Sequence, residues 1–128
     1  MKKWSREELE AVGYKIDNAK ITSVDLSMAD HGVLCLELGL EGGGWGCVYG
    51  GYVLGKGYVG AKEFEDNKGS MEYIMRIMDV VGVSRFNDMK NKIIRVARKG
   101  WGDPIKIIGN CIKENWFDTV SFFEENNN

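Results

Sequence analysis

The chain has 128 residues, and its 17 Lys and Arg residues against 19 Asp and Glu residues give a formal net charge of −2. This length favours a single compact domain. Because 44% of the residues are apolar and 11% are aromatic, the chain can bury a hydrophobic core, which excludes a wholly disordered protein.

No segment of the sequence predicts a membrane anchor, a secretion signal or a metal site. The apolar runs are shorter than the roughly 18 residues needed to cross a bilayer, and residues 1–8 are too polar for a signal peptide. The three cysteines, Cys35, Cys47 and Cys111, include no C-x-x-C pair and leave an odd count, which argues against a disulfide framework or a zinc site. We therefore expect an intracellular protein without a cofactor or a bound metal.

Glycine and positive charge are each concentrated in one part of the chain. Nine of the 17 glycines fall between residues 42 and 60. The segment 85–113 carries eight basic and two acidic side chains, so the remainder of the chain is acidic. A basic segment within a nearly neutral protein is suited to face an anion.

The N-terminal half of the sequence predicts mostly β-structure. Residues 1–14 form an N-terminal arm or a short helix, for which Ser5 is a candidate N-cap. Polar and apolar residues alternate over 24–28 and 33–40 on either side of an Asp-His-Gly turn, which predicts a hairpin. A third strand begins at Trp45 and continues to residue 54 through consecutive glycines, which are typical of a bulge or of a close backbone approach.

The C-terminal half predicts two helices followed by two strands. Apolar residues recur at helical spacing over 71–78, with Ser70 as the candidate N-cap and Gly82 as the C-terminal stop. A second, shorter helix follows. Strand patterns then occupy 93–97 and 105–112.

This order of elements predicts one α+β domain over residues 15–123, between an N-terminal arm or helix at 1–14 and a frayed tail at 124–128. Short connections between neighbouring strands favour an antiparallel sheet. We expect about five strands, with one or two helices inserted between the third and the fourth.

The sequence does not predict catalysis. His31 is the only histidine, which excludes a multi-histidine metal site and a two-histidine mechanism. No G-x-S-x-G nucleophile motif and no G-K-[ST] phosphate loop occurs, and the glycines at 42–46 lack the strand–helix context of a dinucleotide-binding fingerprint. The pair Asp30-His31 also suits a structural histidine on the hairpin turn. We expect a binding protein and not an enzyme.

The glycine-rich segment is the first candidate for a ligand site. Its bare backbone, flanked by Trp45, Tyr49 and Tyr52, can hold a planar or anionic ligand. The same residues equally suit a tightly packed hairpin that binds nothing, and this alternative stays open.

The basic strand is the second candidate. Arg95, Arg98 and Lys99 end this strand beside Trp101, and basic groups that meet phosphates beside an aromatic ring are the features of a nucleotide site. Strand alternation places Arg95 and Lys99 on one face and Arg98 on the other, and a solvated charged face is the alternative. A sequence pI near 5.5 favours a small anionic ligand over duplex DNA.

These motifs resemble those of a family of small, mostly phage-encoded proteins. The similarity is carried by the D-H-G turn at 30–32, the leucine-alternating strand after it, and the G-x-G-x-x-x-G-G-Y stretch at 44–52. Segments 80–83, 100–104 and 108–117 also fit the family pattern, so the resemblance extends from residue 15 to residue 118.

The resemblance implies a role in counter-defence. One class of short phage proteins sequesters the cyclic nucleotides that bacterial CBASS or Thoeris systems use as alarm signals. The chain is similar to such an anti-CBASS sponge, an immune-evasion protein in the host cytoplasm that binds a cyclic oligonucleotide, such as a cyclic dinucleotide, without cleaving it. Because a chain this small rarely encloses such a ligand, we expect a homo-oligomer, a dimer or a tetramer, with pockets near the subunit contacts.

On this hypothesis aromatic rings stack on bases, basic groups meet phosphates and polar groups read base edges. The hypothesis requires the glycine-rich segment and the basic strand to share one cavity. The candidate ligand-binding residues are Asp30, His31, Trp45, Tyr49, Gly50, Gly51, Tyr52, Arg95, Arg98, Lys99, Trp101 and Asn110.

Two other functions remain open at this point. One is a protein–protein inhibitor of a host defence factor, similar to an anti-CRISPR, whose contact surface would be the apolar and acidic end at 122–125. The other is a small phage module that binds single-stranded nucleic acid, with the steep salt dependence that such binding shows.

Overall fold

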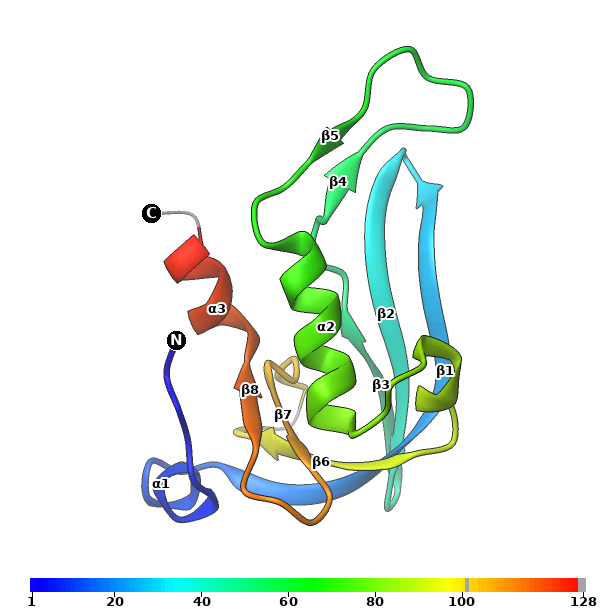
Figure 1. Cartoon of the computed structure of the whole chain (residues 1–128). Coiled ribbons are helices and arrows are strands. Elements are labelled where there is room, and N and C mark those ends of the chain that lie inside the picture. The colour runs from blue at the N-terminus through cyan, green and yellow to red at the C-terminus, as the bar shows by residue number, and fades with distance from the viewer. Residues whose placement is uncertain (101, 127–128) are drawn as a thin grey trace.

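The computed structural model describes residues 1–100 and 102–126 of the chain (Figure 1). These residues form eight strands, three α-helices and one 3₁₀-helix. In chain order the elements are α1 (Arg6–Ala11), β1 (Lys15–Asp30), β2 (Val33–Gly42), β3 (Trp45–Gly50), β4 (Gly55–Lys56), β5 (Glu65–Asp66), α2 (Ser70–Val81), η1 (Phe86–Met89), β6 (Ile93–Arg98), β7 (Ile107–Asn110), β8 (Trp116–Asp118) and α3 (Thr119–Asn126).

The strands form one antiparallel sheet in the order β5-β4-β2-β1-β6-β7-β8. β3 lies off this path and pairs with the second half of β2, while β4 pairs with the first two residues of β2. The predicted hairpin is therefore confirmed, since β1 and β2 pair directly across the turn at residues 31–32.

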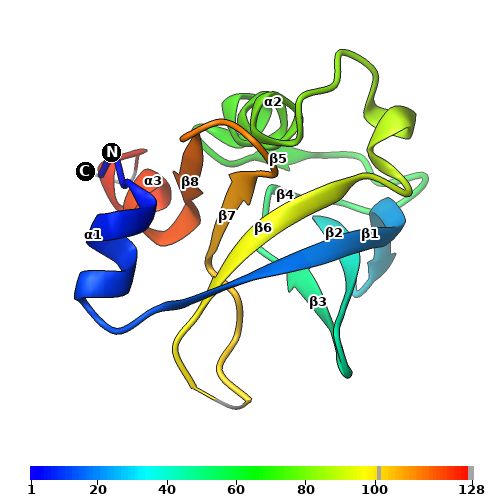
Figure 2. The same cartoon turned by 90° about the horizontal axis from the view of Figure 1, so that it is seen from below.

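The 16-residue strand β1 joins the two halves of the sheet. Its first part pairs with β6, from Lys15 opposite Arg98 to Lys20 opposite Ile93, and its second part pairs with β2. The register with β2 shifts between Ile21 and Ser23, and such irregularities bend and twist a strand. The sheet consequently curls, as Figure 2 shows from below.

Helix α2 packs against the main core of the sheet. Its N-cap is Gly69, whose φ of 84° is left-handed, and not Ser70 as predicted. Ser70 is the first helical residue, and its hydroxyl donates to the carbonyl of Leu54 at 2.7 Å. α2 ends at Gly82, also left-handed, as the sequence predicts. The helix buries Tyr73, Ile77, Val80 and Val81, which recur at helical spacing.

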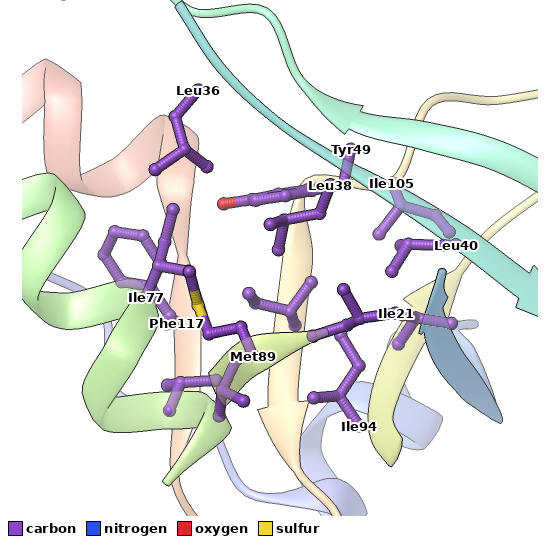
Figure 3. Packing of buried hydrophobic residues seen from close by; sticks show 14 of the residues in the cluster. Ile21, Leu36, Leu38, Leu40, Tyr49, Ile77, Met89, Ile94, Ile105 and Phe117 are labelled. Atoms are coloured by element: carbon purple, nitrogen blue, oxygen red, sulfur yellow. The ribbon is translucent and has the colours of Figure 1, made fainter. Parts of the chain in front are cut away.

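The main core lies between α2 and the curled sheet. Figure 3 shows part of this core, with Ile77 of α2, Met89 of η1, Leu36 of β2 and Phe117 of β8 among its labelled members. Fully burying side chains of this kind contributes about 1.5–3 kcal/mol each. The core also contains Ala19, Ile21, Leu38, Leu40, Tyr49, Leu54, Ile94, Val96, Ile105, Ile108 and Phe122.

Helix α1 builds a second, smaller cluster on the opposite face of β6 and β7. Leu9 is fully buried there against Ala97, Ile107 and Trp116. The helix has a capping box in which the Ser5 hydroxyl accepts from the Glu8 amide. Of the two predictions for residues 1–14, the short helix is confirmed, and it is packed.

The prediction of about five strands is wrong, because the described residues form eight. The third strand ends at residue 50 and not at 54, and the two-residue strands β4 and β5 follow it. The last predicted strand ends at residue 110, and β8 is an additional strand. Such short strands are defined by backbone pairing with distant partners, and two residues carry no periodicity that a sequence pattern could show.

α2 and η1 lie in the chain between β5 and β6, and the tail is helical as far as Asn126. Within residues 1–100 and 102–126, no helix combines the length and apolar character that crossing a membrane requires.

Candidate functional site

A pocket of about 550 Å³ lies where the turn between β2 and β3 approaches the C-terminal end of β6. β1 forms one wall, the glycine turn forms another, and the segment after β6 forms the third. The lining residues are Lys15, Asp17, Asn18, Gly43, Gly44, Trp45, Arg98, Lys99 and Gly100.

Arg98 is the organising side chain of this pocket. One guanidinium nitrogen, Nη1, donates to Oδ2 of Asp17 at 2.9 Å. The guanidinium carbon lies 4.4 Å from the centroid of the Trp45 ring, which is cation–π geometry. Only 18% of the Arg98 side chain is exposed, so its orientation is set by two neighbours before any ligand arrives.

Trp45 takes its position because Gly42 lies directly opposite it across the turn. A Cβ at position 42 would overlap the indole ring. Gly42 therefore lets the ring lie across the adjoining strand, where it packs at the rim of the main core and meets Arg98. The turn residues Gly43 and Gly44 face open space.

The pocket is electropositive. Lys15, Arg98 and Lys99 line it against the carboxylate of Asp17, which also lies 3.9 Å from the Lys15 ammonium. The Lys99 ammonium lies 4.7 Å above the Tyr14 ring, which holds this flexible side chain near the end of β6. Three cations and one carboxylate suit an anionic ligand.

A second pocket, of about 260 Å³, shares Trp45 and Arg98 with the first. Burial raises the pKa of the Cys47 thiol, and the Arg98 charge opposes this shift, so Cys47 is not an activated nucleophile. The lining residues of this pocket are Trp45, Gly46, Cys47, Arg98, Gly102, Asp103, Pro104 and Ile105.

Three of the predicted ligand residues thus come together, namely Trp45, Arg98 and Lys99. Arg98 and Arg95 lie on opposite faces of β6, as strand alternation predicts. Trp101 lies outside the described residues.

Arg95 does not reach the pocket. It is 8% exposed, and its Nε and Nη2 donate to the carbonyls of Asn110 and Lys113, each at 2.7 Å. Its guanidinium lies 4.7 Å from the Trp116 ring, on the face of the sheet that α1 covers. Arg95 therefore has a structural role and, contrary to the prediction, is not placed to meet a phosphate. Its face of β6 is covered by α1 and Trp116.

Asn110 is also occupied by structural contacts. Its amide nitrogen donates to the Val80 carbonyl at 2.9 Å, and its Oδ1 accepts from the amides of Ile112 and Lys113. These bonds tie α2 to the loop between β7 and β8. Asn110 does not line the pocket and has no free edge to read a base.

The two tyrosines of the glycine-rich segment face the core. Tyr49 is fully buried and its hydroxyl bonds to that of Thr119. Tyr52 is half-buried, with its ring 5.3 Å from Phe123 and 5.9 Å from Tyr73. Base stacking on Tyr49 or Tyr52 is not available in this structure, because these rings complete the hydrophobic interior.

Gly50 and Gly51 have φ values of 117° and 81° and turn the chain away from β3. A Cβ on Gly50 would overlap the Leu36 carbonyl, so this glycine permits a close approach of two backbone segments. The two glycines do not line the pocket, and their role here is to shape the fold.

Asp30 and His31 lie on the turn at the far end of β1 from Lys15 (Figure 1). Their side chains are 89% and 92% exposed and contact each other through Oδ1 and Nδ1. His31 has a left-handed φ of 56°, which a turn of this kind requires. The turn and the pocket are separate, so neither residue contributes to it within one subunit.

The sequence did not single out Lys15, Asp17 or Asn18. Their signal is the register of β1 with β6, which sets Lys15 opposite Arg98 and Asp17 opposite Val96. Residues directly opposite each other in antiparallel strands share a face of the sheet, which is why Lys15 and Asp17 lie on the same face as Arg98. That pairing joins segments more than 70 residues apart, and local patterns do not reveal it.

Comparisons with protein-family models, with curated proteins and with solved structures find no match to this chain. The function is therefore inferred from the residues themselves. Within residues 1–100 and 102–126, no three His, Cys, Asp or Glu side chains are grouped so that they could hold a metal ion.

Proposed function

We propose that the protein binds and sequesters a cyclic oligonucleotide second messenger without cleaving it, as an immune-evasion protein of a phage in the host cytoplasm. The observation that supports this most directly is the shared pocket. The glycine turn at 43–44 and the basic end of β6 line one electropositive cavity, with Trp45 and Arg98 stacked at its centre.

The charge of the pocket suits such a ligand. A cyclic dinucleotide has two phosphodiester groups and so carries two negative charges. Lys15, Arg98 and Lys99 against Asp17 leave two net positive charges in the pocket. Bare backbone at Gly43 and Gly44 allows a bulky anion to approach closely, since no side chain projects there.

The proposed absence of cleavage follows from the side chains that line the pocket. Lys15, Arg98 and Lys99 carry hydrogen-bond donors and no acceptor, which suits them to hold phosphates. The carboxylate of Asp17 is engaged by Arg98. His31 lies on the distant turn.

The proposal also includes a homo-oligomer. The pocket is open on one side, and a cyclic dinucleotide held with the nanomolar affinity that sequestration needs, about −12 kcal/mol, is best enclosed by two subunits. A dimer or tetramer that places two such pockets face to face would enclose the ligand.

Isothermal titration with cyclic di- and trinucleotides tests the proposal. We expect at least one of them to bind with submicromolar affinity, and Arg98→Ala to weaken that binding at least tenfold. Arg85→Ala is the matched control, because Arg85 is exposed and does not line the pocket. Absence of heat with every cyclic nucleotide at micromolar protein would refute the proposal.

Arg98→Ala also removes contacts to Asp17 and Trp45, so a loss of binding must be separated from a loss of folding. Lys99→Ala removes a pocket charge with less effect on packing and should weaken binding in the same direction. Circular dichroism of each variant identifies any that fail to fold.

A protein–protein inhibitor remains the second candidate, and a different surface now favours it. The 122–125 end does not supply an exposed apolar patch, because Phe122 is buried and Phe123 packs on Tyr52 and Tyr73. The loop between β4 and β5 does expose apolar side chains, with Val59 90% and Phe64 62% exposed.

Co-purification from host lysate separates the two candidates. A stoichiometric host protein whose retention is lost in Val59→Glu would favour the inhibitor. A retained small nucleotide, detected by native mass spectrometry, would favour the sponge and would also report the number of subunits.

A further inference from the structure

The two pockets beside Trp45 and Arg98 differ in chemistry, and together they describe a site with two parts. The first pocket has three basic side chains. The second combines apolar Pro104 and Ile105 with a carboxylate, that of Asp103. Trp45 and Arg98 line both pockets, so the two form adjacent halves of one surface.

We infer that the first pocket holds phosphate and the second holds a nucleobase, with Asp103 selecting guanine. This inference rests on the proposed function, because it assigns the parts of a nucleotide to the two pockets. Phosphate belongs in the half that carries Lys15 and Lys99. A flat base belongs in the second half, where Trp45 and Pro104 supply apolar lining.

Asp103 lies at the boundary between the halves. Its amide donates to the Gly100 carbonyl at 3.2 Å, which closes a tight turn after β6. A Cβ at Gly100 would lie only 2.7 Å from Oδ2 of Asp103, so the carboxylate folds back over this glycine. Gly100 lines the first pocket and Asp103 the second, so the Asp103 carboxylate is the charged acceptor that the second pocket offers to the edge of a base.

The choice of guanine follows from the donors and acceptors on base edges. An ionised carboxylate only accepts hydrogen bonds, and two oxygens side by side match two adjacent N–H donors. Guanine presents such a pair, N1–H and the N2 amino group. Adenine presents an amino group next to the acceptor N1, which a carboxylate repels. Cytosine likewise presents a donor beside an acceptor. Uracil and thymine present one N–H donor and no second donor beside it.

Titration of cyclic di-GMP and cyclic di-AMP against the full chain and against Asp103→Asn tests this inference. The wild type should bind cyclic di-GMP about tenfold or more tightly than cyclic di-AMP, as one bidentate contact to a base allows. In Asp103→Asn the ratio of the two affinities should fall towards one. The ratio is the readout because removing a negative charge beside a basic pocket affects both anions alike.

Asp88→Asn is the matched control, because Asp88 is exposed on η1 and does not line either pocket. It should leave the ratio unchanged. Comparable affinity for both probes in the wild type, or an unchanged ratio in Asp103→Asn, would overturn the inference while leaving the proposed function standing. Absence of binding by every cyclic nucleotide would instead refute the proposed function and the inference with it.

Discussion

Arg98 and Trp45 illustrate how a glycine can determine the position of an aromatic ring and, through it, of a charge. The ring lies where a Cβ on Gly42 would be, and the guanidinium stacks on the ring while Asp17 holds one of its nitrogens. The orientation of the pocket's central cation therefore depends on a residue that carries no side chain.

We predict that Gly42→Ala displaces Trp45 and destabilises the protein by about 1–3 kcal/mol, the usual cost of overpacking. Denaturant unfolding followed by tryptophan fluorescence measures both effects. Gly43→Ala is the control, because a Cβ there meets nothing within 4 Å. If the two variants unfold at the same denaturant concentration, the ring does not depend on Gly42.

The two most deeply buried tyrosines should respond differently to loss of the hydroxyl group. Tyr49 bonds to the Thr119 hydroxyl, whereas the Tyr73 hydroxyl has no hydrogen-bond partner within residues 1–100 and 102–126. Tyr49→Phe should lower the free energy of unfolding by about 1–2 kcal/mol, because it leaves Thr119 unsatisfied. Tyr73→Phe should be neutral or slightly stabilising, and a loss comparable to that of Tyr49→Phe would contradict this assignment.

Strand β6 contributes side chains to both hydrophobic clusters. Ile94 and Val96 enter the main core, Ala97 enters the smaller cluster beneath α1, and Arg98 ends the strand at the pocket. Helix α1 seals the second of these faces through Leu9. Its six residues are too few for independent stability, so the helix persists because of this packing.

Leu9→Ala should therefore destabilise the whole domain by about 2–5 kcal/mol, as expected for a leucine removed from a well-packed site. Urea unfolding monitored by circular dichroism gives the free energy. Val12→Ala at the end of the same helix is the control, since Val12 is 49% exposed and should change stability by less than about 0.5 kcal/mol. A small effect of Leu9→Ala would mean that residues 1–14 behave as a loose arm after all.

At the scale of the whole molecule, the buried tyrosines make the free energy of unfolding depend on pH in the alkaline range. Burial raises the pKa of both Tyr49 and Tyr73 above the ordinary value of 10. The folded chain thus keeps these protons at pH values where the unfolded chain releases them. The stabilisation is fully present below pH 10 and is lost as the pH rises above it.

We predict that the free energy of unfolding falls above about pH 10, by up to about 1.4 kcal/mol per pH unit for each of the two tyrosines. Urea unfolding at several pH values between 8 and 11 measures the slope, in buffers of the same ionic strength. Tyr73→Phe should make the fall shallower, because one titrating group is gone. An equal slope in wild type and variant would show that Tyr73 does not titrate differently in the two states.

Local patterns were sufficient for the hairpin of β1 and β2 and for helix α2, because alternation and helical spacing are visible within a dozen residues. Local patterns also indicated the glycine turn and Arg98 as parts of the anion site that we propose. They could not place Lys15 and Asp17, whose role depends on the distant pairing of β1 with β6.

Tyr49 and Arg95 lie away from the pocket for the same physical reason. A tyrosine or an arginine can serve the interior as well as a ligand, and residue type alone does not decide between them. Tyr49 fills the core, while Arg95 satisfies backbone carbonyls and stacks on Trp116. Which face of a strand is covered depends on the elements packed against it. These are α2 and the rest of the main core on one face, and α1 with β8 on the other.

The double pairing of β1 has a consequence for how the pocket comes into being during folding. β2 and β3 follow β1 closely in the chain and can associate early, whereas β6 must close a loop of more than 70 residues before it reaches β1. The pocket uses residues from both sides of this closure, so we expect it to be assembled only in the last step. A bound ligand would then slow unfolding and leave the folding rate almost unchanged, since no early intermediate offers it a place to bind.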